Sequence, residues 1–472
     1  MELVQGLNRA ARINATGLAT IDGNRRRTWA ETADRIAKLA GGLRKLGIAQ
    51  GDRVAILALN SDRYFELLYA VPCLGAIVVP LNIRLAAPEI AFTLEDSGAR
   101  MLVVDDAYAD LPNRLPGLFA VDHIVHIGDG SAPAGMRPFE SLLDQPLRLD
   151  GLAGGDDVAG IFYTGGTTGR SKGVMLTHRN LVSNAIMVIS AFGYRYDSVY
   201  IHSPPMFHLA DGASTFAVTM VGGTHVFIPK FDPAQMLEAV QRHRVTNALL
   251  VPTMAAMIAN HPDIAQYDIS SLHTIPYGAS PMPEAVLRKA TEVMPTVRFL
   301  HVYGMTEAAP IATAMDLHIP VSGSRLKSCG RPALLCDIRV CDADDNEVPR
   351  GTVGEVQVRG PNIMLGYWNQ PEMTAHALRG GWYHSGDGGY MDDDGYLYIV
   401  DRLKDMIITG GENVYSAEVE NAIALLDGVA EVAVIGIPDD RWGEAIHAIV
   451  VPRPGAALTE EAVIAHSRSL IA

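Results

Sequence analysis

Short apolar runs alternate with segments of helical periodicity along most of this chain. Val54–Leu59 is apolar throughout, which is typical of a strand buried on both faces of a sheet. Trp29 begins a helical pattern for which Thr28 and Glu31 form a capping box, and Ser61 is placed to cap the helix that follows the strand. This alternation predicts a mostly parallel sheet with helices on both faces.

The same alternation of strands and helices continues and then gives way to short strands separated by turns. A further helix is expected at Leu181–Phe192. Between about residues 322 and 367, short β-rich pieces such as Arg339–Cys341 and Gly354–Arg359 are separated by Gly, Pro and Asp turns, which predicts a small barrel or antiparallel sheet. The other expected strands are Met101–Val104, His123–Ile127, Val158–Tyr163, Val226–Pro229, Ala248–Val251 and His273–Tyr277.

A domain boundary is expected at Asp401–Lys404, after a stretch rich in glycine and aspartate. The residues beyond it predict a small α+β unit. Its expected elements are a helix that Ser416 caps and that ends at Gly428, strands at Val432–Ile437 and His447–Val451, and a helix that begins at Thr459.

Composition limits the class of protein. With 472 residues the chain is long enough for roughly three domain-sized units. Its net charge of −15 argues against nucleic-acid binding, because an acidic protein repels the phosphate backbone. Four cysteines without a CxxC pattern favour a reducing compartment. The apolar run Leu67–Leu81 contains Pro72 and Pro80 and is shorter than the ~20 residues of a membrane span, so we expect buried core in a soluble, cytoplasmic protein without a secretory signal.

The most informative segment is the glycine- and threonine-rich stretch Tyr163–Gly173. It follows an expected strand and precedes the helix expected at Leu181–Phe192. Glycines allow backbone N–H groups to wrap an anion, threonine hydroxyls add donors, and Lys172 adds charge, so the stretch suits a polyphosphate. It is not a Walker A loop, because Arg170 and Ser171 stand where that pattern needs glycine. The alternative is a glycine-rich surface turn.

This stretch resembles the phosphate loop of the adenylate-forming superfamily, which includes acyl-CoA synthetases, luciferases and peptide-synthetase adenylation domains. Ser171 stands where the family usually has proline, which should loosen the turn and leave its chemistry unchanged. Further resembling motifs follow in the family's order. They are Tyr303–Glu307, Gly354–Glu355, Tyr383–Asp387, Asp401–Lys404 and Gly410–Asn413.

The resemblance implies both a fold and a reaction. Residues 1–400 would form a large N-terminal AMP-binding domain of stacked α/β sheets with a small β-barrel subdomain, residues 401–404 a hinge, and residues 405–472 a small mobile α+β domain. The implied reaction uses ATP and Mg²⁺ to convert a carboxylic acid into an acyl-adenylate with release of pyrophosphate, and then transfers the acyl group to coenzyme A.

The resemblance also implies roles for residues. Lys172, Thr306, Glu307 and His208 would be catalytic, and Glu307 would hold Mg²⁺, because a carboxylate beside phosphates needs a cation between them. Tyr303 would stack on adenine, and Asp387 would accept from the ribose hydroxyls. The implied nucleotide-binding residues are Thr164, Gly165, Gly166, Thr167, Thr168, Gly169, Gly278, Ala279, Ser280, Tyr303, Gly304, Thr306, Asp387 and Arg402.

Other positions would serve the acid and the thiol. The resemblance places His208, Tyr277, Met282 and Met305 in the acyl pocket, Gly410 and Gly411 in the CoA channel, and Lys404 at the hinge. The largely apolar pocket, without a counter-charge for an amino group, favours a fatty or aromatic acid. Taken singly, His208 and Tyr277 could also be structural residues.

Some alternatives stay open. The family's second catalytic lysine lies near the C-terminus, whereas Lys404 is the last lysine here, so we expect a truncated chain that forms adenylate slowly. Instead of a CoA ligase, the protein could load a carrier protein or bind nucleotides without catalysis. A homodimer is the oligomeric state considered, and fatty acid metabolism the metabolic setting.

Overall fold

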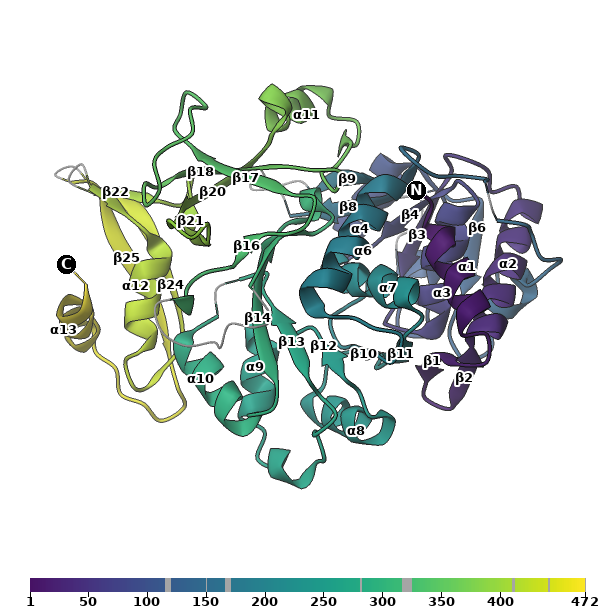
Figure 1. The fold of residues 1–472 in the computed structure, drawn as a ribbon, viewed down its shortest axis with the longest axis horizontal. Coiled ribbons are helices and arrows are strands. Elements are labelled where there is room, and N and C mark those ends of the chain that lie inside the picture. The colour runs from purple at the N-terminus through teal and green to yellow at the C-terminus, as the bar shows by residue number, and fades with distance from the viewer. Residues whose placement is uncertain are drawn as a thin grey trace.

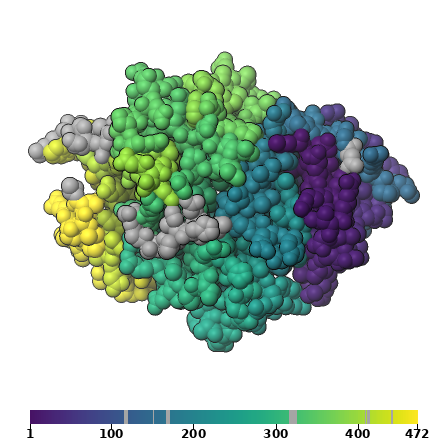
Figure 2. Space-filling model, in the orientation of Figure 1, coloured from purple at the N-terminus to yellow at the C-terminus, as the bar shows by residue number. Residues whose placement is uncertain are grey.

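The computed structural model describes residues 1–114, 120–149, 151–165, 171–280, 282–315, 325–409, 412–439 and 442–471. The N-terminal elements lie at one end of the molecule and the C-terminal elements at the other (Figure 1), and the surface view shows the same separation of purple and yellow segments (Figure 2). Within the described part of the chain, no helix combines the length and apolar character needed to cross a membrane.

The first large sheet has eight strands and carries the glycine-rich stretch. Its neighbours from β8 through β4, β3, β5 and β6 to β7 pair in parallel, and β9 and β19 join antiparallel at the other edge. In sheet order the strands are β19 (Gly366–Tyr367), β9 (Lys172–Thr177), β8 (Val158–Thr164), β4 (Ile77–Pro80), β3 (Arg53–Leu57), β5 (Ala99–Val104), β6 (His123–His126) and β7 (Arg137–Pro138).

A second large sheet has nine strands, parallel in its centre and antiparallel at both edges. An early segment, β1, pairs in parallel with β11 of the middle of the chain, so distant segments share one sheet (Figure 1). The order is β16 (Arg331–Pro332), β15 (Ile311–Ala314), β14 (Arg298–Gly304), β13 (Thr274–Tyr277), β12 (Asn247–Ala248), β10 (Val199–His202), β11 (Thr224–Phe227), β1 (Leu18–Asp22) and β2 (Arg25–Thr28).

Helices follow the strands as the alternation predicted. The capping box at the start of α2 is present, since Thr28 accepts from the backbone N–H of Glu31, and Ser61 caps α3 through Tyr64 N–H. The main helices of this part are α1 (Leu3–Ile13), α2 (Trp29–Lys45), α3 (Asp62–Cys73), α4 (Ala87–Ser97), α6 (His178–Phe192), α7 (Leu209–Val221), α8 (Pro233–His243), α9 (Pro252–Ala259), α10 (Glu284–Val293) and α11 (Pro371–Ala377). The mixed α/β class is therefore confirmed.

Two smaller sheets complete the fold. We expected a small barrel or antiparallel sheet, and the described strands form an antiparallel sheet of β17 (Asp337–Cys341), β18 (Gly354–Arg359), β20 (Tyr383–Met391) and β21 (Leu397–Arg402). The C-terminal sheet contains β23 (Glu412–Val414), β22 (Ile407–Thr409), β25 (Gly443–Pro452) and β24 (Val429–Asp439), with helices α12 (Ser416–Ala424) and α13 (Glu460–Leu470). A separate apolar cluster around Val419, Ile423 and Val434 forms its core.

One expectation about the C-terminal helix was wrong. Ser416 does not cap α12, because Tyr415 occupies the N-cap position and makes no side-chain cap hydrogen bond. Ser416 is instead the first helical residue, and both its backbone N–H and its hydroxyl donate to Asp401 Oδ2, at 2.6 and 2.8 Å. The pairing joins α12 to the end of β21. At the other helix the expectation was right, since Thr459 accepts from Ala462 N–H.

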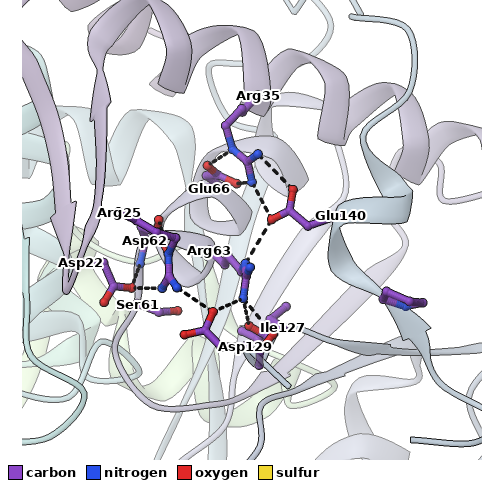
Figure 3. Close-up of polar contacts among 12 residues, drawn as sticks. Asp22, Arg25, Arg35, Ser61, Asp62, Arg63, Glu66, Ile127, Asp129 and Glu140 are labelled. Carbon is purple, nitrogen blue, oxygen red and sulfur yellow. Dashed lines mark hydrogen bonds and ion pairs between the residues drawn. The ribbon is translucent and has the colours of Figure 1, made fainter. Parts of the chain in front are cut away.

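A network of ion pairs fastens the N-terminal elements to one another (Figure 3). Arg25 on β2 contacts three carboxylates, of Asp22, Asp62 and Asp129, at 2.6, 3.1 and 2.6 Å. Burial and the neighbouring Asp62 raise the pKa of Asp22 to about 6. Carboxylates from three segments of the chain therefore meet one guanidinium group.

The same network continues to α2. Arg35 binds Glu66 of α3 through two nitrogen atoms, at 2.7 and 3.1 Å, and also binds Glu140. The Glu66 side chain is only 1% exposed, so its charge depends on Arg35 for compensation. Arg63 links Glu140 to Asp129 and closes the network.

Candidate active site

The glycine-rich stretch connects two strands rather than a strand and a helix. β8 ends at Thr164 and the antiparallel strand β9 begins at Lys172, with these two residues paired in register. Helix α6 (His178–Phe192) contains the helix expected at Leu181–Phe192, whereas strand β9 between the loop and this helix was not expected. The short apolar alternation after Lys172 forms a strand because β8 offers it a free edge. Gly165 faces open space, since an added Cβ would meet no atom within 4 Å.

Several residues assigned to this loop lie outside the described residues. They are Gly166, Thr167, Thr168 and Gly169. Their roles in phosphate binding remain predictions. The loop's two described ends, Thr164 and Lys172, fix where it starts and finishes.

Lys172 and Glu307, which are far apart in sequence, both contact one tyrosine. Lys172 Nζ lies 5.5 Å from the ring centroid of Tyr367, a cation–π distance. The hydroxyl of Tyr367 donates to Glu307 Oε1 at 2.8 Å. Burial, followed by the charge of Glu307, raises the pKa of Tyr367, so the hydroxyl keeps its proton and donates. The structure thus brings the loop's lysine and the predicted metal-binding glutamate to one place.

The chemistry of Glu307 suits a hard cation. It lies with Thr306 in a short 3₁₀ turn, Thr306–Ala308, after β14, and its backbone carbonyl accepts from Met364 N–H at 2.8 Å. Among the described residues, no hydrogen bond reaches Oε2 and no lysine or arginine forms an ion pair with the carboxylate. An oxygen donor of this kind is what Mg²⁺ prefers.

A second group of predicted residues also meets. The hydroxyl of Tyr303, at the end of β14, donates to Asp387 Oδ2 at 2.6 Å, and Arg402 Nε lies 3.4 Å from Asp387 Oδ1. Asp387 and Arg402 are register partners on β20 and β21. Burial raises the pKa of Asp387 despite the hydrogen bond from Tyr303 and the charge of Arg402. Tyr303 itself is held by its hydroxyl, which gives its ring a fixed position.

The small residues after β13 have a structural explanation. A Cβ on Gly278 would lie 2.4 Å from the carbonyl oxygen of Val302, and one on Gly304 would lie 1.9 Å from that of Pro310. Both glycines therefore allow neighbouring backbone to approach, and the role of Gly278 in nucleotide binding stays a prediction. Ala279 has a left-handed φ of 69°, a strained conformation that non-glycine residues seldom adopt. Ser280 follows it as an exposed residue.

The four residues assigned to the acyl pocket have different surroundings. Tyr277 is buried and stacks on His301, with ring centroids 4.9 Å apart, and Met282 packs against the same apolar cluster. Met305 packs against the larger N-terminal cluster, and His208 is exposed immediately before α7. The ring of His208 lies 4.3 Å from that of Phe207. Their shared role in binding an acid stays a prediction.

Comparison with known proteins assigns the chain to a family. Residues 7–368 match the AMP-binding enzyme family, and residues 418–472 match the AMP-binding enzyme C-terminal domain.

The chain belongs to the AMP-binding enzyme family.

Individual proteins resemble this AMP-binding enzyme over nearly their whole length. A feruloyl-CoA synthase from Amycolatopsis sp is 41% identical, with 98% of this chain and 91% of that protein covered. A fatty acid–[acyl-carrier-protein] ligase, ScoC, from Streptomyces coeruleorubidus is 35% identical over 96% and 87%. The crystal structure of ATP-bound MatB from Rhodopseudomonas palustris has a TM-score of 0.88 at 30% identity and covers 100% of this chain and 93% of that one.

The predicted hinge of this AMP-binding enzyme lies beside the second group. Lys404 is half exposed and lies 3.6 Å from Asp405, and Leu403 N–H donates to Gly386 O. Gly410 and Gly411, assigned to the CoA channel, lie outside the described residues. The boundaries at residues 401–404 and the role of Lys404 remain predictions.

Sequence reasoning missed two tyrosines of the site. Tyr367 lies on the two-residue strand β19, which is too short for periodicity to reveal. Tyr383 begins β20, and burial followed by the charge of Glu307 raises its pKa. The one available signal was the position of Tyr383 at the start of a motif that already contained Asp387.

Proposed function

We propose that this AMP-binding enzyme activates a hydrophobic carboxylic acid with ATP and joins the acyl group to coenzyme A. The observation that carries the proposal is the placement of Lys172 and Glu307 around Tyr367. A cation and an anion that are close together, yet without an ion-pair partner among the described residues, suit a ligand that carries both phosphate and a divalent cation.

The side chains divide the work by charge. Lys172 would neutralise phosphate oxygens, and Glu307 with Thr306 would hold Mg²⁺, which supplies the positive charge that anionic reactants need. Asp387 offers a buried acceptor for the ribose hydroxyls, with Tyr303 and Arg402 fixing its carboxylate. Aligning the carboxylate of the acid with the α-phosphate would then require mainly positioning and electrostatic stabilisation.

The acid would be aromatic or fatty. The feruloyl-CoA synthase resemblance supports an aromatic acid, and the apolar neighbours of Tyr277, Met282 and Met305 support either class. ScoC favours a second candidate function, the loading of a carrier protein in place of CoA. Our proposal includes a reducing cytoplasmic setting, which four free, buried cysteines support, a hinge at Lys404, and a homodimer as the form to test.

The experiment is a screen of ferulate, benzoate, octanoate and palmitate with ATP, Mg²⁺ and either CoA or a purified acyl carrier protein. Pyrophosphate release that depends on one of these acids, followed by an acyl-CoA product, is expected. Lys172→Met should lower the rate of pyrophosphate release at least about tenfold, as loss of a charged hydrogen-bonding group does. The exposed Lys45→Met is the matched control.

The outcomes separate the candidate functions. Product only with the carrier protein would favour the second candidate. Binding of ATP without pyrophosphate release from any acid would contradict both functions and support a protein that only binds nucleotide.

A further inference from the structure

We infer that Tyr367 is a positioning residue that keeps Lys172 and Glu307 apart and available for the nucleotide and its metal. The inference rests on the proposed function and assigns a role to a residue that no sequence motif singled out. It is carried by the contacts of the Tyr367 ring and hydroxyl with two oppositely charged groups.

The backbone of Tyr367 is held from several sides. β19 pairs with β9 so that Tyr367 lies opposite Val174, and Trp368 N–H donates to Gly173 O at 2.7 Å. The N–H of Tyr367 donates to Thr374 Oγ1 at 2.9 Å. Only 7% of Tyr367 is exposed. The strand that carries Lys172 therefore also fixes the backbone of the tyrosine.

The preceding glycine adds to this constraint. Gly366 has a φ of 152°, and a Cβ there would lie 2.5 Å from Thr374 Cγ2. A side chain at this position would displace Thr374, which accepts the hydrogen bond from Tyr367 N–H. Gly366 thus leaves room for Thr374 and for its hydrogen bond with the backbone of Tyr367.

A tyrosine between the two charges solves an electrostatic problem. If Lys172 and Glu307 touched, they would neutralise each other, and a phosphate and a cation would have to break that pair. The ring instead holds the ammonium group by a cation–π contact, and the hydroxyl holds one carboxylate oxygen. Each interaction is weaker than a buried ion pair, so both charges stay in place and can accept ligands at small cost.

The two halves of the tyrosine have separable effects. Tyr367→Phe removes the hydroxyl and keeps the ring, so Glu307 loses the hydrogen bond that orients it while Lys172 keeps its cation–π contact. Tyr367→Leu removes both, and the lysine is then free to pair with Glu307. A merely structural tyrosine would not separate metal dependence from nucleotide affinity in this way.

The test measures ATP binding by titration calorimetry with and without Mg²⁺. For Tyr367→Phe we expect the Mg²⁺ concentration that half-saturates the effect on ATP binding to rise about tenfold, the size of a lost hydrogen bond to a charged group, with metal-free ATP affinity unchanged within about twofold. For Tyr367→Leu we expect metal-free ATP affinity to fall as well, about threefold. Tyr398→Phe is the control, because its hydroxyl also donates to a carboxylate, that of Asp392.

The possible results are distinguishable. If wild-type protein binds ATP with Mg²⁺ and Tyr367→Phe shows the same Mg²⁺ dependence, the inference is overturned and the proposed function stands. If wild-type protein does not bind ATP at all, both are overturned. Should Tyr367→Leu fail to fold, as its thermal unfolding would reveal, the Mg²⁺ dependence of Tyr367→Phe decides alone.

Discussion

Replacing Arg35 with methionine should destabilise the N-terminal part of this enzyme by about 3–5 kcal/mol. The change keeps much of the side-chain volume and removes the cation that compensates Glu66, whose side chain is 1% exposed. Two hydrogen bonds to Glu66, of 2.7 and 3.1 Å, disappear at once, together with two hydrogen bonds to the more exposed Glu140. Breaking a buried ion pair by removing one partner leaves an uncompensated buried charge, and costs of about 3–5 kcal/mol are typical.

The loss can be expressed as a melting temperature. Unfolding entropy near 2.1 cal/mol/K per residue gives about 0.8 kcal/mol/K for a unit of about 400 residues, so the variant should melt about 4–6 °C lower. Differential scanning calorimetry measures this directly. An exposed arginine, Arg179 with its partner Asp156, offers the matched control, and Arg179→Met should change the melting temperature by less than about 1 °C.

The dependence on pH gives the prediction a sign. Burial already raises the pKa of Glu66, and the hydrogen bonds from Arg35 are the main interaction that lowers it. Loss of Arg35 therefore raises the pKa of Glu66 further. A carboxyl whose folded-state pKa is raised contributes stability that is present at low pH and lost as pH rises through that pKa. The penalty of Arg35→Met should therefore be larger at pH 8 than at pH 5, and Glu66→Gln in the same background should relieve it. A small penalty that is equal at both pH values would refute the reasoning.

Three further changes have defined outcomes. Asp387→Asn should weaken ATP binding about tenfold in calorimetry, because the amide is a poorer acceptor for two hydroxyls while Tyr303 can still donate to it; unchanged affinity would contradict a ribose role. For Asp22→Asn, the melting temperature of the variant minus that of the wild type should increase as the pH rises from 4 to 7. The reason is that the pKa of Asp22 is raised to about 6, so the folded wild-type protein is destabilised when this carboxyl ionises; a difference that does not change with pH would count against this. Gly278→Ala should cost about 1–3 kcal/mol of unfolding free energy in thermal melts, because its Cβ would meet the carbonyl of Val302 at 2.4 Å, and an unchanged melt would show that the strands can move apart.

Local chemistry explains which elements the sequence could predict. Thr28, Ser61 and Thr459 cap the helices they were expected to cap. A hydroxyl just before an amphipathic run can accept a hydrogen bond from a free backbone N–H of the first helical turn, so this role can be predicted from neighbouring residues. Ser416 followed the same rule and was wrong, since Asp401, fifteen residues earlier, accepts its hydroxyl and N–H instead. A long-range acceptor cannot be read from the residues next to a serine.

The same distinction applies to the site. Tyr303 and Asp387 could be named from motifs, but their hydrogen bond joins the end of a strand in one sheet to the middle of a strand in another. β9 was missed because a run of a few residues after a glycine-rich loop has too little periodicity to separate strand from helix. Tyr367 was missed because its contacts come from pairing of β19 with β9 across almost 200 residues of chain.

The arrangement of the site follows from this assembly of short pieces. Lys172 comes from the eight-stranded sheet, Glu307 from a turn after a strand of the nine-stranded sheet, and Asp387 from the antiparallel sheet. No single sheet can hold a nucleotide triphosphate with these groups, so a nucleotide that contacts all three would tie the sheets to one another. Tyr367 and Tyr303 already make such links in their hydroxyl hydrogen bonds, to Glu307 and Asp387. Because both hydroxyls donate to carboxylates, Glu307 and Asp387 are held in place, while Lys172 has no ion-pair partner among the described residues. This distribution of charges is the one that the proposed ATP-dependent ligation of an acid would require.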